Sequence, residues 1–171
     1  MRTVVQNWSQ SDAPGAIRFA EATGDTTVVS AAVGAWASND PIAAADWINE
    51  RHAPDDYVIN SIASAWFTRD EHGAADWAMG LHDPKQRDIA LSSVAQMSSY
   101  RDPASAIDLA LSMTPSEERS AELRSLYVTW VSQDSAAAKR WFGDTRLLED
   151  ARRAITTDQA TEVAQVGCVC P

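Results

Sequence analysis

Aspartate and tryptophan recur together along most of this 171-residue chain, at intervals close to 30 residues. Five aspartates, spaced 28, 30, 32 and 32 residues apart, mark the repeats: Asp12, Asp40, Asp70, Asp102 and Asp134. Four residues before or seven residues after these aspartates lie all seven tryptophans of the chain: Trp8, Trp36, Trp47, Trp66, Trp77, Trp130 and Trp141. Periods of this length indicate a repeat architecture, in which each unit buries its apolar face against its neighbours.

The residues around each aspartate predict a helix hairpin. Aspartate is a favoured N-cap residue, and proline at the next position, as in Pro41 and Pro103, suits the first turn of a helix. Second helices are therefore predicted after the aspartates, at 41–51, 71–81, 103–113 and 135–142. Apolar residues at helical spacing predict first helices before them, at 27–37, 56–68, 86–99 and 117–132. No segment alternates with period two, so the predicted fold class is all-α.

The repeated motif W-x-x-x-D-P-x-x-A-x-x-W resembles the tetratricopeptide-like helical repeats, and more closely a shorter bacterial variety of them, over residues 3–142. The resemblance implies a right-handed solenoid of about five helix hairpins over residues 1–142, which binds peptides or proteins on a concave face without doing chemistry. The two tryptophan columns are interpreted as the packing core of the repeats, not as a ligand platform. Residues 143–166 are predicted to form a C-terminal capping helix region, followed by a short tail at 167–171.

The charge balance narrows the class of partner. Lysine and arginine total 14 against 24 aspartates and glutamates, so the formal net charge is −10. Nucleic-acid binding requires clustered basic residues, and this balance argues against it. No apolar run approaches the length of a membrane span, and the first residues lack the apolar segment of a secretory signal. We expect a cytoplasmic protein that binds neither nucleic acid nor membranes, and the charge favours a basic surface on its partner.

Sequence signatures of catalysis and metal binding are missing. The three histidines, His52, His72 and His82, do not stand at a metal-binding spacing. No nucleotide-binding loop and no G-x-S-x-G motif occurs. We therefore predict no catalytic residue, no bound metal and no cofactor, and the chain is not expected to be an enzyme.

Two groups of charged residues have competing interpretations. Four carboxylates near the second hairpin form either an acidic patch or ordinary solvated surface, and the second reading is preferred: Asp46, Glu50, Asp55 and Asp56. Arg87 and Arg119 occupy corresponding positions in two of the predicted first helices. They either line a groove and meet a carboxylate, or form salt bridges near the helix starts.

Cys168 and Cys170 are the only cysteines, and both lie in the last four residues of the sequence. The ending Cys-Val-Cys-Pro has the cysteine position of a prenylation signal, although proline is not a preferred last residue. Two thiolates supply half of a tetrahedral zinc shell, or a pair of ligands for copper(I). Two further interpretations remain. The cysteines could form a vicinal redox pair, or the ending could have no function of its own.

The ending also resembles the short cysteine-bearing core of ribosomally made peptide precursors, whose preceding segment recruits the modifying enzyme. This resemblance implies that the solenoid docks on a cysteine-modifying partner enzyme, while the tail reaches the active site at high effective concentration. Cys168 and Cys170 would then be the modified residues. The predicted function is a non-catalytic helical-repeat protein that binds a partner protein and presents this tail; the alternative is an interaction scaffold or adaptor whose tail is incidental.

Overall fold

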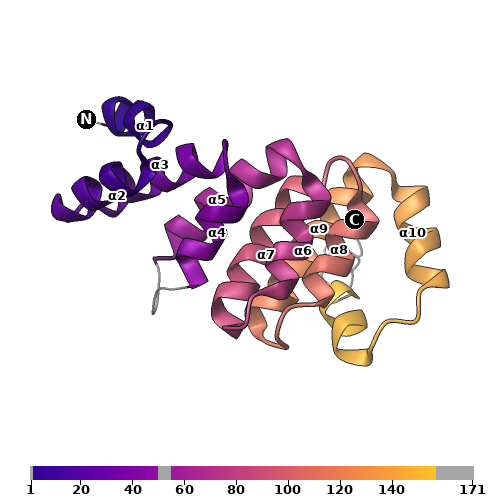
Figure 1. The fold of residues 1–171 in the computed structure, drawn as a ribbon. Coiled ribbons are helices and arrows are strands. Elements are labelled where there is room, and N and C mark those ends of the chain that lie inside the picture. The colour runs from indigo at the N-terminus through magenta and orange to yellow at the C-terminus, as the bar shows by residue number, and fades with distance from the viewer. Residues whose placement is uncertain (1, 50–54, 157–171) are drawn as a thin grey trace, which may run out of the picture. The chain divides into compact units, whose positions relative to one another are not determined.

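The fold is taken from a computed structural model, which describes residues 2–49 and 55–156. Within these ranges the chain consists of helices joined by short turns, without a β-strand, which confirms the predicted all-α class (Figure 1). The helices are α1 (Arg2–Ser9), α2 (Ala13–Ala22), α3 (Thr26–Ala37), α4 (Pro41–Asn49), α5 (Asp56–Arg69), α6 (Glu71–Gly80), α7 (Pro84–Ser98), α8 (Pro103–Leu111), α9 (Glu117–Gln133) and α10 (Ser135–Asp144). A further helical stretch covers residues 149–156.

The repeated aspartates define where the second helices begin. Each aspartate side chain accepts a hydrogen bond from the backbone N–H three residues later, over 2.9–3.1 Å. The acceptors are Asp12, Asp40, Asp70, Asp102 and Asp134. These bonds satisfy an N–H group that has no partner inside the helix. Helix starts are therefore fixed locally, and the predicted ranges agree with the structure to within two residues at these ends.

The cap at Asp102 provides a test of this assignment by pH. Hydrogen bonds from the backbone N–H and the hydroxyl of Ser105 hold the pKa of this carboxyl below its ordinary 3.8. The contribution of the cap to the free energy of unfolding is therefore complete above pH 3.8. It is lost as the pH falls through the lowered pKa of Asp102. Asp102→Ala is expected to lower the free energy of unfolding by about 1 kcal/mol at neutral pH. In urea denaturation the deficit should shrink as the pH is lowered from about 5 to about 2.

Asp108 of the same helix is the matched control for that experiment. Its pKa is raised, first by burial and then by the negative charge of Asp102, so the folded state disfavours its charged form. Asp108→Asn should therefore cause no loss of stability at neutral pH. An equal loss in both variants would mean that Asp102 does not stabilise the helix through its cap.

The chain divides into two compact units, 1–97 and 98–171, where the sequence predicted a single array over 1–142. The division falls inside the fourth hairpin, at the end of α7. Ser98 and Leu109 stand there at the two tryptophan positions of the repeat, so this hairpin has no pair of indoles to hold its helices together.

In the first unit, helix α3 packs against α1, α2, α4 and α5, and α5 also packs against α4 and α6. The buried core is aliphatic, with Ile17, Ile48, Ile59 and Ile62 among its largest members. The alanines four residues after the repeated aspartates are fully buried in both units: Ala16, Ala44, Ala74, Ala106 and Ala138. Their small side chains let the second helix of each hairpin approach its neighbours closely.

In the second unit, α9 packs against α8 and α10 and carries the buried residues Leu123, Tyr127 and Trp130. The helical stretch 149–156 is attached to α9 at two points. Arg119 pairs with Asp150, and the Arg124 Nε donates to the Ala154 carbonyl over 3.3 Å. This stretch lies in the region predicted to cap the array, and residues 157–166 of that region are outside the described residues.

A hydrogen bond recurs between neighbouring hairpins in both units. The guanidinium of Arg69, the last residue of α5, donates to the carbonyls of Ser38 and Asn39 over 3.1 and 2.9 Å. The side chain of Gln133, the last residue of α9, donates to the Ser99 carbonyl over 3.3 Å. In both units the end of a first helix is therefore tied to the turn of the preceding hairpin.

Candidate functional site

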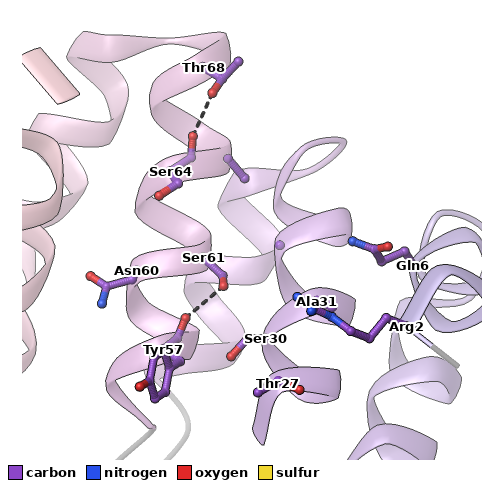
Figure 2. Close-up of a pocket in the computed structure, with 12 residues that line it drawn as sticks. Arg2, Gln6, Thr27, Ser30, Ala31, Tyr57, Asn60, Ser61, Ser64 and Thr68 are labelled. Atoms are coloured by element: carbon purple, nitrogen blue, oxygen red, sulfur yellow. Dashed lines mark hydrogen bonds between the residues drawn. The ribbon is translucent and has the colours of Figure 1, made fainter.

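A groove in the first unit has the form of a binding site. It has a volume of about 680 Å³ and is lined by α1, α3 and α5, which are first helices of three successive hairpins (Figure 2). Small polar residues contribute much of its lining, with Thr27 and Ser30 from α3 and Asn60, Ser61, Ser64 and Thr68 from α5, while apolar atoms make up the larger part of its accessible surface. Figure 2 shows Arg2 and Gln6 reaching toward α3 from α1.

The groove is built from the same face of each repeat. Helix α3 lines the groove with four residues that lie 13, 10, 9 and 6 positions before Asp40. They are Thr27, Ser30, Ala31 and Gly34. Helix α5 contributes the same four positions, which are Tyr57, Asn60, Ser61 and Ser64. The hairpin repeat therefore places equivalent residues side by side along the groove.

Close packing of α3 on α5 forms the floor of the groove. A Cβ atom added at Gly34 would lie 3.4 Å from the Cβ of Ser61, so the two helices nearly touch at this point. The Ser61 hydroxyl donates to the Tyr57 carbonyl over 2.8 Å, and the Thr68 hydroxyl donates to the Ser64 carbonyl over 2.9 Å (Figure 2). Both hydroxyls keep acceptor capacity after these bonds.

The electrostatics of the groove differ from those of the whole chain. The chain carries 24 acidic residues, yet the described residues that line the groove include no carboxylate. Arg2 supplies the formal charge of the lining and is exposed. The tyrosine of the groove, Tyr57, is 65% exposed and places an amphipathic ring at its edge. The described lining residues therefore contribute none of the acidity that favoured a basic partner.

The tryptophan columns form pairs within hairpins. Ring centroids lie 5.8 Å apart for Trp8 and Phe19, 6.5 Å for Trp36 and Trp47, 5.8 Å for Trp66 and Trp77, and 5.5 Å for Trp130 and Trp141. This differs from the predicted core, since only Trp130 is buried, at 8% exposed, whereas Trp8 is 38% exposed and the other five are half-buried. The columns lie near the turn of each hairpin, where the large indole rings join two helices and keep one edge in solvent.

The remaining charged candidates do not meet in one site. Arg119 is buried and pairs with Asp150, which is a salt bridge and not a groove contact. The Nε of Arg87 lies 4.0 Å from Asp88. Asp55 caps α5 by accepting the Tyr57 N–H, and Asp56 pairs with Lys85 at 3.1 Å; Asp46 is exposed. Glu50 lies outside the described residues.

The predictions about metal sites, membrane spans and the tail concern residues of which the structure describes only a part. His72 and His82 are exposed, and the described part of the chain holds no cluster of three or more potential metal ligands. None of its helices combines the length and apolarity required to cross a membrane. His52, Cys168 and Cys170 lie outside the described residues.

Comparison with protein-family models, curated proteins and solved structures gives no match. Function therefore has to be inferred from the groove itself. The groove residues lie outside the tryptophan and aspartate columns on which the sequence predictions rest. A signal was present in the four positions 13, 10, 9 and 6 residues before each aspartate, where small polar residues recur and acidic residues do not.

Proposed function

We propose that this chain is a non-catalytic helical-repeat protein that binds a segment of a partner protein in the groove of α1, α3 and α5. The observation that carries the proposal is the groove itself, an open cavity of about 680 Å³ whose lining comes from equivalent positions of successive repeats. Pockets that bind small molecules have volumes of about 300–1,000 Å³, so this groove is large enough to hold a ligand. The lining offers hydroxyl and amide groups for hydrogen bonds, and it brings together no nucleophile and base that would suggest a reaction.

The proposal includes a right-handed solenoid of about five hairpins. Support comes from the spacing of contacts between hairpins inside each unit. Side chains that join successive repeats are about one period apart in sequence: 30 and 31 residues for Arg69 with Asn39 and Ser38, and 34 for Gln133 with Ser99. Repeat proteins are held together by such nearest-neighbour contacts.

The groove can be tested by blocking it with a charge. Ser64 is exposed and lines the groove, so Ser64→Glu should leave the fold intact while placing a carboxylate in a cavity that has none. The full chain would be screened against an array of random peptides of about ten residues. Affinities of the peptides that bind would then be measured by fluorescence polarisation. Ser64→Glu is expected to weaken binding at least about tenfold, the effect of about 1.4 kcal/mol.

The matched control for this variant is Ser135→Glu, which makes the same exchange at an exposed serine of the second unit. Circular dichroism should show both variants folded, and Ser135→Glu should bind as the parent does. If no peptide binds the parent chain, or if both variants bind equally well, the groove is not the binding site.

The role predicted for the cysteine tail stays a prediction from sequence. Cys168 and Cys170 lie outside the described residues, so the groove supports partner binding without distinguishing a modified tail from an incidental one. Partner binding is common to both functions expected from the sequence, the precursor that presents a tail and the adaptor.

A further inference from the structure

The charge pattern of the groove extends to repeats beyond it. At the same four positions before the aspartate, α7 carries Ile89, Ser92, Ser93 and Gln96, and α9 carries Ala121, Arg124, Ser125 and Val128. Helices α3, α5, α7 and α9 each have four such positions. None of these 16 positions holds an acidic residue. A chain of net charge −10 therefore keeps carboxylates off one face of its repeats.

A second observation points to a ligand at this face. Ser30 lines the groove and is 9% exposed, and its buried hydroxyl has no hydrogen-bond partner among the described residues. A buried hydroxyl without a partner is unfavourable, because most buried polar groups in native structures form a hydrogen bond. Because Ser30 lines the groove, a molecule bound there can supply the hydrogen-bond partner that its hydroxyl lacks within the described part of the chain.

We infer that the groove binds an extended, uncharged polar segment of the partner through its main-chain amides, and that Ser30 forms one of the hydrogen bonds to that main chain. This inference rests on the proposed function and specifies its ligand. Beside Arg2 and the small apolar residues, the lining carries short neutral donors and acceptors, which match the N–H and C=O groups of a peptide backbone.

The lining disfavours two other kinds of segment. An amphipathic helix requires hydrophobic pockets for its apolar anchors, whereas the small apolar lining residues here are Ala31, Gly34 and Ala65. A basic segment would find no carboxylate among the described lining residues, and an acidic one would enter against the net charge of −10 with Arg2 as its counterion. An uncharged segment meets neither obstacle.

The width of the groove sets the length of the segment. Packed helices lie about 8–10 Å apart, so crossing from α1 over α3 to α5 covers about 20 Å. An extended chain rises about 3.3 Å per residue, and about six residues therefore span the groove.

The test compares peptide classes and two serine variants of the full chain. Peptides of about ten residues would be drawn from three sets: uncharged polar, rich in aspartate, and rich in lysine. The uncharged set is expected to contain the tightest binders, measured by fluorescence polarisation. Ser30→Ala should weaken their binding about threefold to tenfold, the effect of one hydrogen bond. Its thermal midpoint should equal or exceed that of the parent, because an unpartnered buried hydroxyl has been removed.

Ser9→Ala is the matched control. Ser9 is 2% exposed, its hydroxyl also lacks a partner among the described residues, and it does not line the groove. Ser9→Ala should therefore leave peptide binding unchanged. Preference for a charged set, or parent-like binding by Ser30→Ala, would overturn the inference. If Ser64→Glu still blocks binding in those cases, the proposed function stands and only the ligand assignment fails; if no set binds, both fail.

Discussion

Replacing Trp130 with alanine is expected to lower the free energy of unfolding by about 3–5 kcal/mol, the range for removing a large aromatic side chain from a core. Trp130 is the buried member of the tryptophan columns, and its ring lies 5.5 Å from that of Trp141. The substitution removes this contact and leaves a cavity between α9 and α10. Urea denaturation followed by circular dichroism measures the loss.

Trp8→Ala is the control for that measurement. Trp8 contacts Phe19 at 5.8 Å but is 38% exposed, so less apolar area leaves water when its hairpin folds. We expect a loss of about 1 kcal/mol, close to the value of an aromatic pair. Equal losses for Trp8→Ala and Trp130→Ala would contradict the assignment of Trp130 to the core.

The second large effect is expected at Asp150, which is the ion-pair partner of a buried arginine. The Arg119 side chain is 6% exposed, and its other hydrogen bond in the described structure goes to the Met113 carbonyl at 3.4 Å. Asp150→Ala would leave the guanidinium buried without a counterion. We expect a loss of about 2–4 kcal/mol, somewhat below the usual cost of breaking a buried pair because Asp150 is itself half exposed.

The companion variant Arg119→Met separates charge from packing. Methionine retains much of the side-chain length and removes the buried charge. Water can then hydrate the Asp150 carboxylate in place of the guanidinium. The loss should be about 1 kcal/mol and smaller than that of Asp150→Ala. Hydrogen exchange should show amides of residues 149–156 exchanging faster in Asp150→Ala. A larger loss in Arg119→Met would mean that the aliphatic part of the arginine matters more than its charge.

Local chemistry made much of the helix pattern predictable from sequence. An aspartate cap depends on the few residues that follow it, and a helical period is visible in a single segment. The first helices at 56–68 and 117–132 therefore differ by one residue at one end from α5 (Asp56–Arg69) and α9 (Glu117–Gln133). Helix α7 begins at Pro84 rather than 86 because proline is accepted in the first turn.

Burial and site formation depend on tertiary packing and were harder to predict. The tryptophan columns gave the register of the repeat, but Trp8 and Trp130 stand at the same position of it and are 38% and 8% exposed. Arg119 and Arg87 occupy corresponding positions, yet Arg119 pairs with Asp150, 31 residues later, whereas the Nε of Arg87 lies 4.0 Å from its neighbour Asp88. The groove escaped prediction because serine, threonine and alanine at a helix surface are unremarkable one helix at a time, and become informative when three helices bring them together.

The ties between neighbouring hairpins have a consequence for how such a chain is assembled over evolutionary time. Arg69 and Gln133 differ in charge and shape, yet each donates to a backbone carbonyl of the preceding turn. Every amino acid supplies that carbonyl, so the preceding hairpin needs no matching side chain. The turn residues can therefore diverge in sequence without loss of this bond, provided that the following repeat keeps a donor side chain at the end of its first helix.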